Sequence, residues 1–349
     1  MNKIQLIPMV FKKINYDLPI YIYGAGITAS KVYSYLSSFE VNISGFVVDK
    51  RNIESLCDLA VLDFKILEEG PVNLVLGFVP TNETVDEISE NVTAKFKSIN
   101  FITYDFSFLS FGLFGEQYFE SQEFRFVMDL LEDSCSVETL IGYVKSRNTG
   151  NYRFCEQFYD PNQYFSNNII SLNKNETFVD CGVYDGQTIK EFILRNNNSF
   201  EYVYGFEPDI TNYKKSINNL KFIPSEKIEL YNLGSWSKKE ILRFNSISER
   251  VSEIDPNGSF EIKVDSIDNL IKDRPVSFIK MDVEGAELNS LKGAENTIKL
   301  NKPKLAICLY HKPEDIFEII SFIDKLGLSY KFYIRLHTRY SQELVLYCV

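Results

Sequence analysis

The clearest pattern of apolar and polar positions lies between residues 177 and 208. An apolar segment runs into an acid and a glycine-containing turn at 180–186, and the stretch 188–195 that follows has apolar residues at helical spacing. A second apolar segment, 202–206, ends in Glu207. This order predicts a β-turn-α-β unit with a carboxylate at the end of its second strand, where open α/β sheets bind ligands.

The same alternation continues to the end of the chain. Further strands are predicted at 228–232, 276–281 and 304–310, a β-hairpin excursion at 242–244 and 260–264, and helices at 211–220, at 286–298 and up to about 326. The last two apolar segments, 330–336 and 343–347, are joined by a short turn. A parallel crossover needs about a dozen residues or more, so these segments must form a hairpin that adds an antiparallel strand to a parallel sheet.

The first part of the chain predicts a smaller domain of similar type. Strands are expected at 20–23, 41–48, 73–79 and 101–104, with helices from the glycine turn at 24 to about 38 and from about 83. We therefore expect three parts: a Rossmann-like domain over residues 1–110, a helical connector or cap over 111–176 (helices at 123–131 and 137–144), and a second α/β domain over 177–349.

Composition narrows the class of protein. The 349 residues suggest two domains, and a hydrophobic content of 45% indicates a globular chain. The net charge of −11 disfavours nucleic acids and anionic membranes as main partners, since both bind clustered Lys and Arg. The six scattered cysteines and two histidines form no recognisable zinc site. No signal peptide or apolar stretch of membrane-spanning length is found, so we expect a cytoplasmic protein without a membrane span.

The turn of the second domain departs from the dinucleotide-binding pattern. It reads G-x-x-x-G, with Gly182 and Gly186, and Asp180 stands before the first glycine. Asp180 and Asp185 would repel a pyrophosphate at the helix N-terminus, whereas they would attract an amino group and a sulfonium. Glu207 follows the turn at roughly the 20-residue offset expected of an acid that binds ribose hydroxyls. These features favour S-adenosylmethionine over NAD as the cofactor.

Three segments resemble the FkbM family of S-adenosylmethionine-dependent methyltransferases. They are FVDCGVYDGQT at 178–188, GFEP at 205–208 and IKMDVEGAE at 279–287, and the stretches 305–311 and 330–349 are also similar. The resemblance covers about half of the chain, 177–349. It implies a class I methyltransferase fold, a parallel sheet with a C-terminal antiparallel hairpin, preceded here by the smaller Rossmann-like domain. It also implies O-methylation of a hydroxyl on a small-molecule or sugar acceptor, such as a carbohydrate precursor of a surface polysaccharide or a related metabolite.

The cofactor site is expected to lie on the glycine turn and the neighbouring strand ends. The residues assigned to it are Asp180, Gly182, Tyr184, Gly186, Thr188, Glu207, Gly234 and Ser235. Asp180 and Gly182 would shape the methionine pocket, with Asp180 near the amino group. Glu207 would accept hydrogen bonds from the ribose hydroxyls. Residues 233–235 would flank the adenine.

The catalytic residues are expected at the ends of the fourth and fifth strands of this domain. Asp282 and Glu284 are candidates for the base or for an anchor of the acceptor, and His311 is a second candidate base. The alternatives are helix capping for the acids, including Glu287, and a structural role for His311. Asp282, Glu284 and Glu287 are oxygen ligands suited to Mg²⁺, but their spacing does not require a metal and we expect none. Lys280 could pair with a neighbouring acid.

Parts of the sequence also suggest two other functions. Gly24-x-Gly26-x-x-Ala29, with Asp49 some two dozen residues later, nearly completes a dinucleotide fingerprint and suggests an NAD-dependent or bifunctional oxidoreductase. The first domain is, however, too short for a full NAD fold with a catalytic domain, and no Tyr-x-x-x-Lys pattern lies nearby. A non-catalytic assembly module would not need acids at three strand ends.

Overall fold

The computed structural model describes residues 9–68, 70–78, 85–115, 117–244, 260–272 and 274–349. The chain divides into two compact units, one made of residues 1–113 with 144–154 and the other of 114–143 with 155–349. The domain boundaries predicted near residues 110 and 176 stay predictions. Each unit is described by itself.

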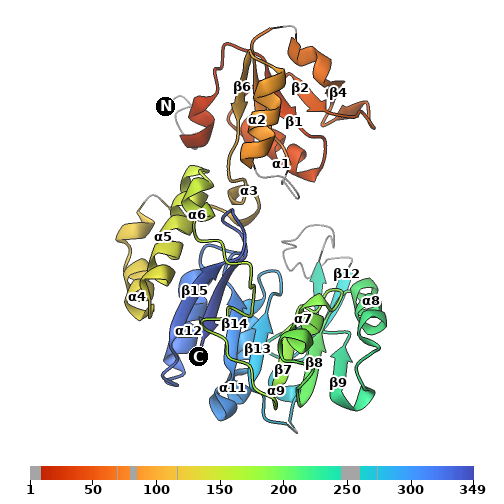
Figure 1. Ribbon diagram of the computed structural model, residues 1–349, viewed down its shortest axis with the longest axis vertical. Coiled ribbons are helices and arrows are strands. Elements are labelled where there is room, and N and C mark those ends of the chain that lie inside the picture. The colour runs from red at the N-terminus through yellow and green to blue at the C-terminus, as the bar shows by residue number, and fades with distance from the viewer. Residues whose placement is uncertain (1–8, 69, 79–84, 116, 245–259, 273) are drawn as a thin grey trace. The chain divides into compact units, whose positions relative to one another are not determined.

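The first unit is a six-stranded α/β sheet (Figure 1). Its strands are β1 (Ile20–Tyr23), β2 (Gly45–Val48), β3 (Ser55–Leu56), β4 (Leu59–Asp63), β5 (Val72–Leu76) and β6 (Ile99–Ile102). Its helices are α1 (Ile27–Ser38), α2 (Val85–Lys95) and α3 (Phe108–Phe111), with 3₁₀ turns at Met9–Lys13 and Phe64–Glu68. The strand order is β3-β4-β2-β1-β5-β6, and the pairs other than β3 with β4 are parallel.

This unit confirms the expected Rossmann-like arrangement, with one addition. The short antiparallel pair β3–β4 was not predicted, because two and five residues are too few to show a clear period. The ends predicted at 79 and 83 for a strand and a helix lie outside the described residues. Helix α2 turns Val85, Ile88 and Val92 toward the core at the helical spacing that the sequence shows.

The second unit has a seven-stranded sheet and a smaller three-stranded one. The strands of the large sheet are β7 (Thr177–Cys181), β8 (Tyr202–Phe206), β9 (Ile228–Tyr231), β13 (Phe278–Met281), β14 (Lys304–Cys308), β15 (Phe332–Leu336) and β16 (Leu344–Cys348). The small sheet contains β10 (Gly234–Ser235), β11 (Glu240–Phe244) and β12 (Phe260–Asp265). The antiparallel pair β11–β12 confirms the predicted excursion.

Helices flank the large sheet. They are α4 (Gln122–Leu130), α7 (Gln187–Arg195), α8 (Ile210–Leu220), α9 (Ile267–Leu270), α10 (Glu287–Lys292), α11 (Glu295–Asn301) and α12 (Asp315–Lys325), with 3₁₀ turns at Tyr118–Glu120 and Ser225–Lys227. Helices α5 (Ser134–Thr149) and α6 (Arg153–Glu156) are divided between the two units. In the described part of the chain, no helix combines the length and apolarity needed to cross a membrane.

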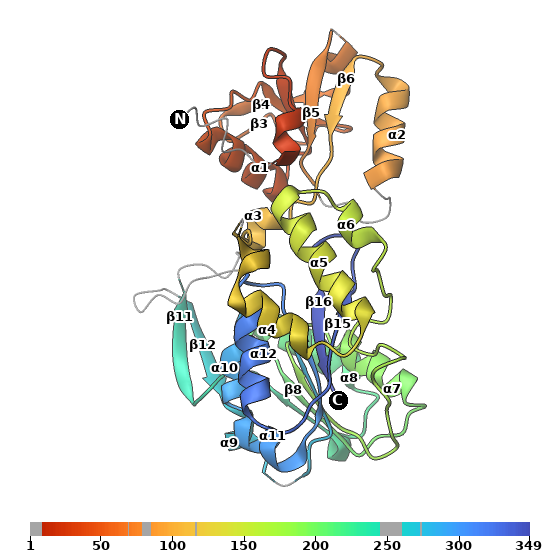
Figure 2. The ribbon, with the colours of Figure 1, turned by 90° about the vertical axis from the view of Figure 1, so that its left-hand side faces the viewer.

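The strand order of the large sheet, β15-β16-β14-β13-β7-β8-β9, indicates where a ligand would bind. Strand β16 runs antiparallel to both of its neighbours, which confirms the predicted hairpin. The connections from β7 to β8 and from β13 to β14 cross the sheet in opposite directions. Because such crossovers are right-handed, α7 and α8 cover one face and α10 to α12 cover the other (Figure 2). Ligands bind at the carboxyl ends where this reversal occurs, here between β7 and β13.

Aromatic side chains fill the centre of this sheet. The ring of Phe178 on β7 lies 4.6 Å from that of Phe192 on α7 and 5.0 Å from that of Phe278 on β13, centroid to centroid. Phe165 packs against all three. The core therefore holds together the strands whose ends carry the predicted site.

The segment before β7 also covers the edge of the sheet. Leu131 forms a parallel bridge with Phe332 of the edge strand β15, and Asp133 pairs with Arg335 at 2.7 Å. Exposed strand edges invite pairing with other chains, so this contact protects β15. The predicted helices 123–131 and 137–144 correspond to α4 and to part of α5.

One predicted helix, 286–298, is interrupted. The chain forms α10 and α11 instead, with Gly293 between them. A Cβ atom at Gly293 would come within 1.9 Å of the Trp236 carbonyl oxygen, so the backbone passes close to a strand-end loop at this point. A contact this distant in sequence cannot be read from helical periodicity.

Candidate active site

Four neighbouring parallel strands carry the predicted site residues at their carboxyl ends. Glu207 follows β8, Gly182 follows β7, Asp282 follows β13 and His311 lies three positions after β14. Because these strands are adjacent and parallel, their ends meet at one edge of the sheet. The structure therefore brings the predicted cofactor turn and the predicted catalytic acids together.

The glycine turn fits closely against the end of β13. Gly182 and Gly186 have φ angles of 87° and 88°, which glycine adopts without the steric cost of a side chain. A Cβ atom at Gly182 would come within 1.9 Å of the Asp282 carbonyl oxygen. Tyr184, in the same turn, also has a left-handed φ of 52° and is 60% exposed.

Asp180 forms a buried ion pair beneath this turn. Its carboxylate lies 2.9 Å from the Lys280 ammonium, and the two side chains are 0% and 2% exposed. Lys280 also donates to the carbonyl oxygens of Gly182, at 2.8 Å, and Cys181, at 3.2 Å. Burial alone would lower the pKa of Lys280, but the carboxylates of Asp180 and Asp282 outweigh it and hold this pKa above its usual value. Asp180 thus acts on the turn through Lys280, and its predicted place near the amino group of the cofactor, directly or through water, stays a prediction.

Both carboxylate oxygens of Glu207 accept a backbone hydrogen bond, and each can accept a further one. Its Oε2 accepts from the Tyr184 N–H at 2.8 Å, and its Oε1 accepts from the Asp209 N–H at 2.9 Å. Burial raises the pKa of Glu207, and the two N–H groups oppose that shift. An ionised carboxylate has about four lone-pair positions, so two further donors can bind. Asn232, which the sequence analysis missed, donates to the carbonyl oxygens of Glu207 and Pro208 and fixes this loop.

The other predicted cofactor residues lie around the same edge. Thr188 is in the first turn of α7 and is partly buried. Gly234 and Ser235 form β10, which pairs with β12. The Ser235 hydroxyl forms a 2.8 Å hydrogen bond with the Ser290 hydroxyl on α10. Their assignment to the adenine stays a prediction.

Two tyrosine hydroxyls orient Asp282. Its Oδ2 accepts from Tyr164 at 2.8 Å and its Oδ1 from Tyr310 at 3.1 Å. Burial raises the pKa of Asp282, but Lys280, His311 and the two hydroxyls outweigh it, so the pKa lies below its usual value. Asp282 is therefore a well-held anion and a weak proton acceptor. The sequence does not connect either tyrosine with Asp282, because neither lies near it in the chain, and Tyr164 was expected to belong to the core more than to contact a ligand.

His311 is buried among three carboxylates. Its Nδ1 lies 3.0 Å from Glu287, and its Nε2 lies 3.5 Å from Glu284 and 3.6 Å from Asp282. Burial alone would lower the pKa of His311, but these acids, Glu287 foremost, raise it well above 6.5. These carboxylates therefore favour the charged form of the imidazole. An imidazolium has no free lone pair, so the charged form would act electrostatically, and the role of His311 as a base stays a prediction.

The acids after Asp282 have separate roles. Glu287 is fully buried in the first turn of α10, and it accepts from the Val283 N–H of the preceding loop at 2.8 Å in addition to its contact with His311. Glu284 keeps 55% of its side chain exposed and has a left-handed φ of 55°. The turn therefore presents Glu284 to solvent at the sheet edge and keeps Glu287 inside.

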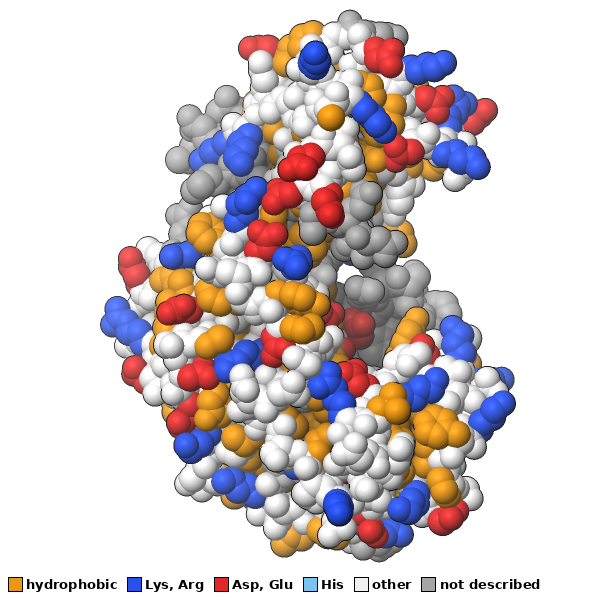
Figure 3. Space-filling view, viewed as in Figure 1, with side chains coloured by type: hydrophobic (Ala, Val, Ile, Leu, Met, Phe, Trp, Pro, Cys, Tyr) orange, Lys and Arg blue, Asp and Glu red, His pale blue; other side chains and the backbone are white. Residues whose placement is uncertain are grey.

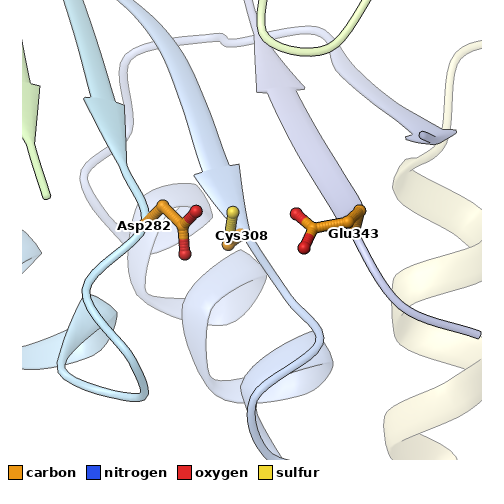
Figure 4. A group of neighbouring side chains, drawn as sticks. All are labelled: Asp282, Cys308 and Glu343. Atoms are coloured by element: carbon orange, nitrogen blue, oxygen red, sulfur yellow. The ribbon is translucent and has the colours of Figure 1, made fainter. Parts of the chain in front are cut away.

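A further carboxylate, Glu343, completes the site and was not predicted. It stands immediately before β16, whose antiparallel direction brings its start to the edge where β14 ends. Figure 4 shows the carboxylates of Asp282 and Glu343 pointing toward Cys308 from opposite sides. The Glu343 Oε2 accepts from the Gln163 amide at 2.7 Å. Burial, and then Asp282, raise the pKa of Glu343 to about 7. The predicted hairpin contained the signal, since an antiparallel strand places its first residue at this edge.

Two sets of side chains among the described residues have ligand atoms close enough to share a cation. They are Asp282 with Cys308 and Glu343, and Asp282 with Glu287 and His311, each within 4.8 Å. In the second set, Glu287 and His311 neutralise each other as an ion pair. The expectation of no metal stays a prediction.

The glycine motif of the first unit has a similar position on its own sheet. Gly24 follows β1 with a φ of 118°, and Gly26 precedes α1. Asp49, after β2, accepts a hydrogen bond from the Tyr23 hydroxyl at 2.6 Å. The NAD-binding alternative stays a hypothesis about these residues.

Charge on the visible face gives no sign of a nucleic-acid surface. Figure 3 shows basic and acidic side chains interspersed over the face in view rather than gathered into a basic patch.

Comparison with known proteins agrees with this geometry. Residues 180–331 match the family model described as the methyltransferase FkbM domain. No curated protein sequence matches the chain. Among solved structures, methyltransferase FkbM from Methylobacillus flagellatus KT is similar over 100% of this chain and 94% of its own, with 21% identity and a TM-score of 0.77. At that identity the likeness shows a shared fold.

Other solved structures match only part of the chain. An rRNA methylase from Streptococcus thermophilus is similar over 51% of this chain and 87% of its own, with 14% identity and a TM-score of 0.32. Aeropyrum pernix fibrillarin, solved with bound S-adenosyl-L-methionine, is similar over 52% and 70%, with 12% identity and a TM-score of 0.32. The family match begins at Asp180 and contains the site from Gly182 to His311, so this chain carries an S-adenosylmethionine-dependent methyltransferase domain of the FkbM type.

Proposed function

We propose that this enzyme is a cytoplasmic O-methyltransferase that methylates a hydroxyl of a sugar or glycan precursor. The observation that carries the proposal is the row of groups along one sheet edge, from Glu207 through the Gly182 turn to Asp282. A nucleoside-binding acid thus stands two strands away from an ionised carboxylate suited to hold a hydroxyl.

The cofactor would lie over the ends of β7 and β8. Glu207 would accept hydrogen bonds from the ribose hydroxyls with its remaining lone pairs. The Gly182 turn would admit the methionine portion close to the backbone, and Gly234 and Ser235 would border the adenine. When bound, S-adenosylmethionine supplies an activated methyl group on a sulfonium. The acids at the end of β13 provide a negative environment for that positive charge.

The acceptor would lie over the ends of β13 and β14. Asp282, fixed by two tyrosine hydroxyls, would accept a hydrogen bond from the hydroxyl to be methylated and orient its oxygen. Glu284, exposed at the rim, would bind a second hydroxyl of the acceptor. His311, charged and buried, would hold both carboxylates in place. Several hydroxyl-binding acids in a row favour a polyhydroxylated acceptor over an apolar one.

The test is a screen for methyl transfer with the full-length enzyme. Nucleotide sugars and simple glycosides would be incubated with methyl-labelled S-adenosylmethionine, and products would be identified by mass spectrometry. We expect a sugar methyl ether, with kcat lowered about 10²-fold or more in Asp282→Asn. Glu295→Gln, which changes an exposed acid of α11 paired with Lys299, is the matched control. Transfer to nitrogen or carbon, or to no member of the sugar panel, would contradict the proposal.

A further inference from the structure

We propose that Glu343 is the catalytic base, which takes the proton from the acceptor hydroxyl as the methyl group is transferred. This inference rests on the proposed O-methyl transfer and names the residue that carries out its proton step. The base would thus come from the C-terminal hairpin, while the anchor, Asp282, comes from the end of β13.

The backbone fixes Glu343 at the site. The Glu343 carbonyl oxygen accepts from the His337 N–H at 3.0 Å, and the next residue, Leu344, accepts from the Leu309 N–H at 2.8 Å. Glu343 is therefore held between the adjoining strands β15 and β14, not on a free loop. Its position before an antiparallel strand places it beside residues at the ends of parallel strands.

The side chains around Glu343 converge on one small region. The carboxylates of Asp282 and Glu343 face each other across the Cys308 sulfur, with ligand atoms within 4.8 Å (Figure 4). Gln163 holds Oε2 of Glu343, and Tyr164, the next residue, holds Oδ2 of Asp282. One short segment before β7 thus orients both acids. A hydroxyl anchored on Asp282 would lie within reach of Glu343.

The surroundings give Glu343 a higher pKa than Asp282. The titratable, charged and hydrogen-bonding groups that face Glu343 are Asp282 after β13, Cys308 on β14, Tyr310 and His311 after it, and Gln163 and Tyr164 before β7. Burial and the Asp282 charge raise the pKa of Glu343 to about 7, while the pKa of Asp282 is lowered. General bases work best with a pKa near the working pH, and neighbouring carboxylates with separated pKa values divide anchoring from proton transfer.

The other candidate bases fit this step less well. Glu287 and the other acidic neighbours of His311 raise its pKa and so favour its protonated form, which cannot accept a proton. Glu284 is 55% exposed, so its carboxylate lies in water at the rim and not in the buried region between Asp282 and Glu343. Glu343 combines partial burial with a direct approach to Asp282.

Four of the eleven non-glycine residues with positive φ in the described part of the chain lie at this edge, and the others are spread over both units. Tyr164, Tyr184, Glu284 and Glu343 all have left-handed φ angles, of 64°, 52°, 55° and 47°. Such conformations cost about 1–3 kcal/mol each in residues other than glycine and tend to cluster at active sites. They come from four separate segments of the chain, and all four segments meet at this sheet edge.

The step balances without another reactant. The bond between the methyl carbon and sulfur breaks, and its electron pair stays on sulfur to give S-adenosylhomocysteine. The acceptor oxygen forms a bond to the methyl carbon, and its proton moves to the Glu343 carboxylate. Because Glu343 is partly exposed, the proton can pass to water before the next cycle.

The first experiment needs no acceptor. Infrared difference spectra of the full-length enzyme would follow carboxyl protonation from about pH 5 to about pH 9. Two carboxyl groups, Glu343 and Asp315, have a pKa raised to about 7, so we expect a band that titrates near pH 7, loses the Glu343 part in Glu343→Gln and is unchanged in the control Glu295→Gln. A spectrum of Glu343→Gln identical to that of the wild type would overturn the proposal.

The second experiment measures the rate with the acceptor found in the screen. Glu343→Gln should lower kcat by about 10²–10⁴-fold and remove the rising limb of its pH profile, while Glu343→Asp should retain that limb. Gln163→Leu removes a hydrogen bond that lowers the pKa of Glu343, so the limb should move to higher pH. An unchanged kcat and pH profile in Glu343→Gln would contradict the proposal.

S-adenosylhomocysteine binding separates this inference from the proposed function. Glu343→Gln should bind it as tightly as the wild type, which also shows that the variant is folded. If methyl transfer to sugars is absent in the wild type, the proposed function fails. If transfer occurs and is insensitive to Glu343, only the assignment of the base fails.

Discussion

Replacing Lys280 by Met should destabilise the second unit strongly. The substitution keeps the apolar stem but removes the ammonium 2.9 Å from Asp180, whose side chain has no exposed surface. Removing one partner of a buried pair typically costs about 3–5 kcal/mol, because the remaining charge is left without a partner. Folded proteins are stable by only about 5–15 kcal/mol, so this loss is a large share. We expect Tm to fall by roughly 6–20 °C, at about 2–4 °C per kcal/mol.

The single tryptophan of the chain gives a local signal for this unit. Trp236 donates to the Asp265 carbonyl oxygen from its backbone and to Glu240 from its indole, all within the second unit. Its fluorescence during urea or thermal unfolding would therefore report on this unit when the whole chain does not unfold in one step. The matched variant is Asp180→Asn combined with Lys280→Met, which removes both charges.

The double variant tests the physical reason. If the uncompensated carboxylate causes the loss, Asp180→Asn/Lys280→Met should be more stable than Lys280→Met alone. A Lys280→Met enzyme within about 1 kcal/mol of the wild type would refute the reasoning. A double variant as unstable as Lys280→Met would also refute the reasoning. The lost stability would then come from packing or from the hydrogen bonds that Lys280 donates to the Gly182 turn.

Three further predictions concern the cofactor turn and the histidines. Gly182→Ala should weaken S-adenosylhomocysteine binding at least tenfold in calorimetry, because the new Cβ atom would lie 1.9 Å from the Asp282 carbonyl oxygen. An unchanged affinity would show that the turn can move away without cost. Glu207→Gln should weaken the same binding by about 2 kcal/mol, roughly 30-fold, and an affinity change under threefold would exclude a charged contact to the ligand. In NMR titrations, His311 should stay protonated above pH 6.5, because carboxylates led by Glu287 raise its pKa. His337 should stay neutral below pH 6.5, because burial lowers its pKa. The contribution of His311 to stability is then complete below pH 6.5 and is lost as the pH rises through its raised pKa. The contribution of His337 is present above pH 6.5 and is lost as the pH falls through its lowered pKa. Titration of both histidines over the same pH range would contradict this prediction.

The sequence predicted the elements whose pattern is local. Strand β8 (Tyr202–Phe206) lies where an apolar run ends in an acid, and β16 is antiparallel because the preceding turn is too short for a crossover. The glycine turn at 182 was recognised because its spacing to Glu207 reflects one β-α-β unit. Each of these signals depends on neighbouring residues in the chain.

The contacts that complete the site depend on distant residues. Tyr164 reaches Asp282 across 118 positions, and Gln163 reaches Glu343 across 180. Periodicity shows which face of an element is buried, but it does not show which side chains meet across strands. The antiparallel direction of β16 decides where Glu343 lies, and that consequence was not drawn from the sequence. Lys280 was recognised as a possible partner for an acid, and the structure identifies Asp180 as that acid.

Calorimetric titration of the full-length enzyme with S-adenosylhomocysteine tests the central claim most directly. Wild type should bind with a micromolar dissociation constant, and Glu207→Ala should lose this binding because the carboxylate at the end of β8 is gone. Glu229→Gln, an exposed acid on the neighbouring strand β9, should bind like the wild type. Absence of binding to the wild type, or equal binding by Glu207→Ala, would contradict the cofactor site described above.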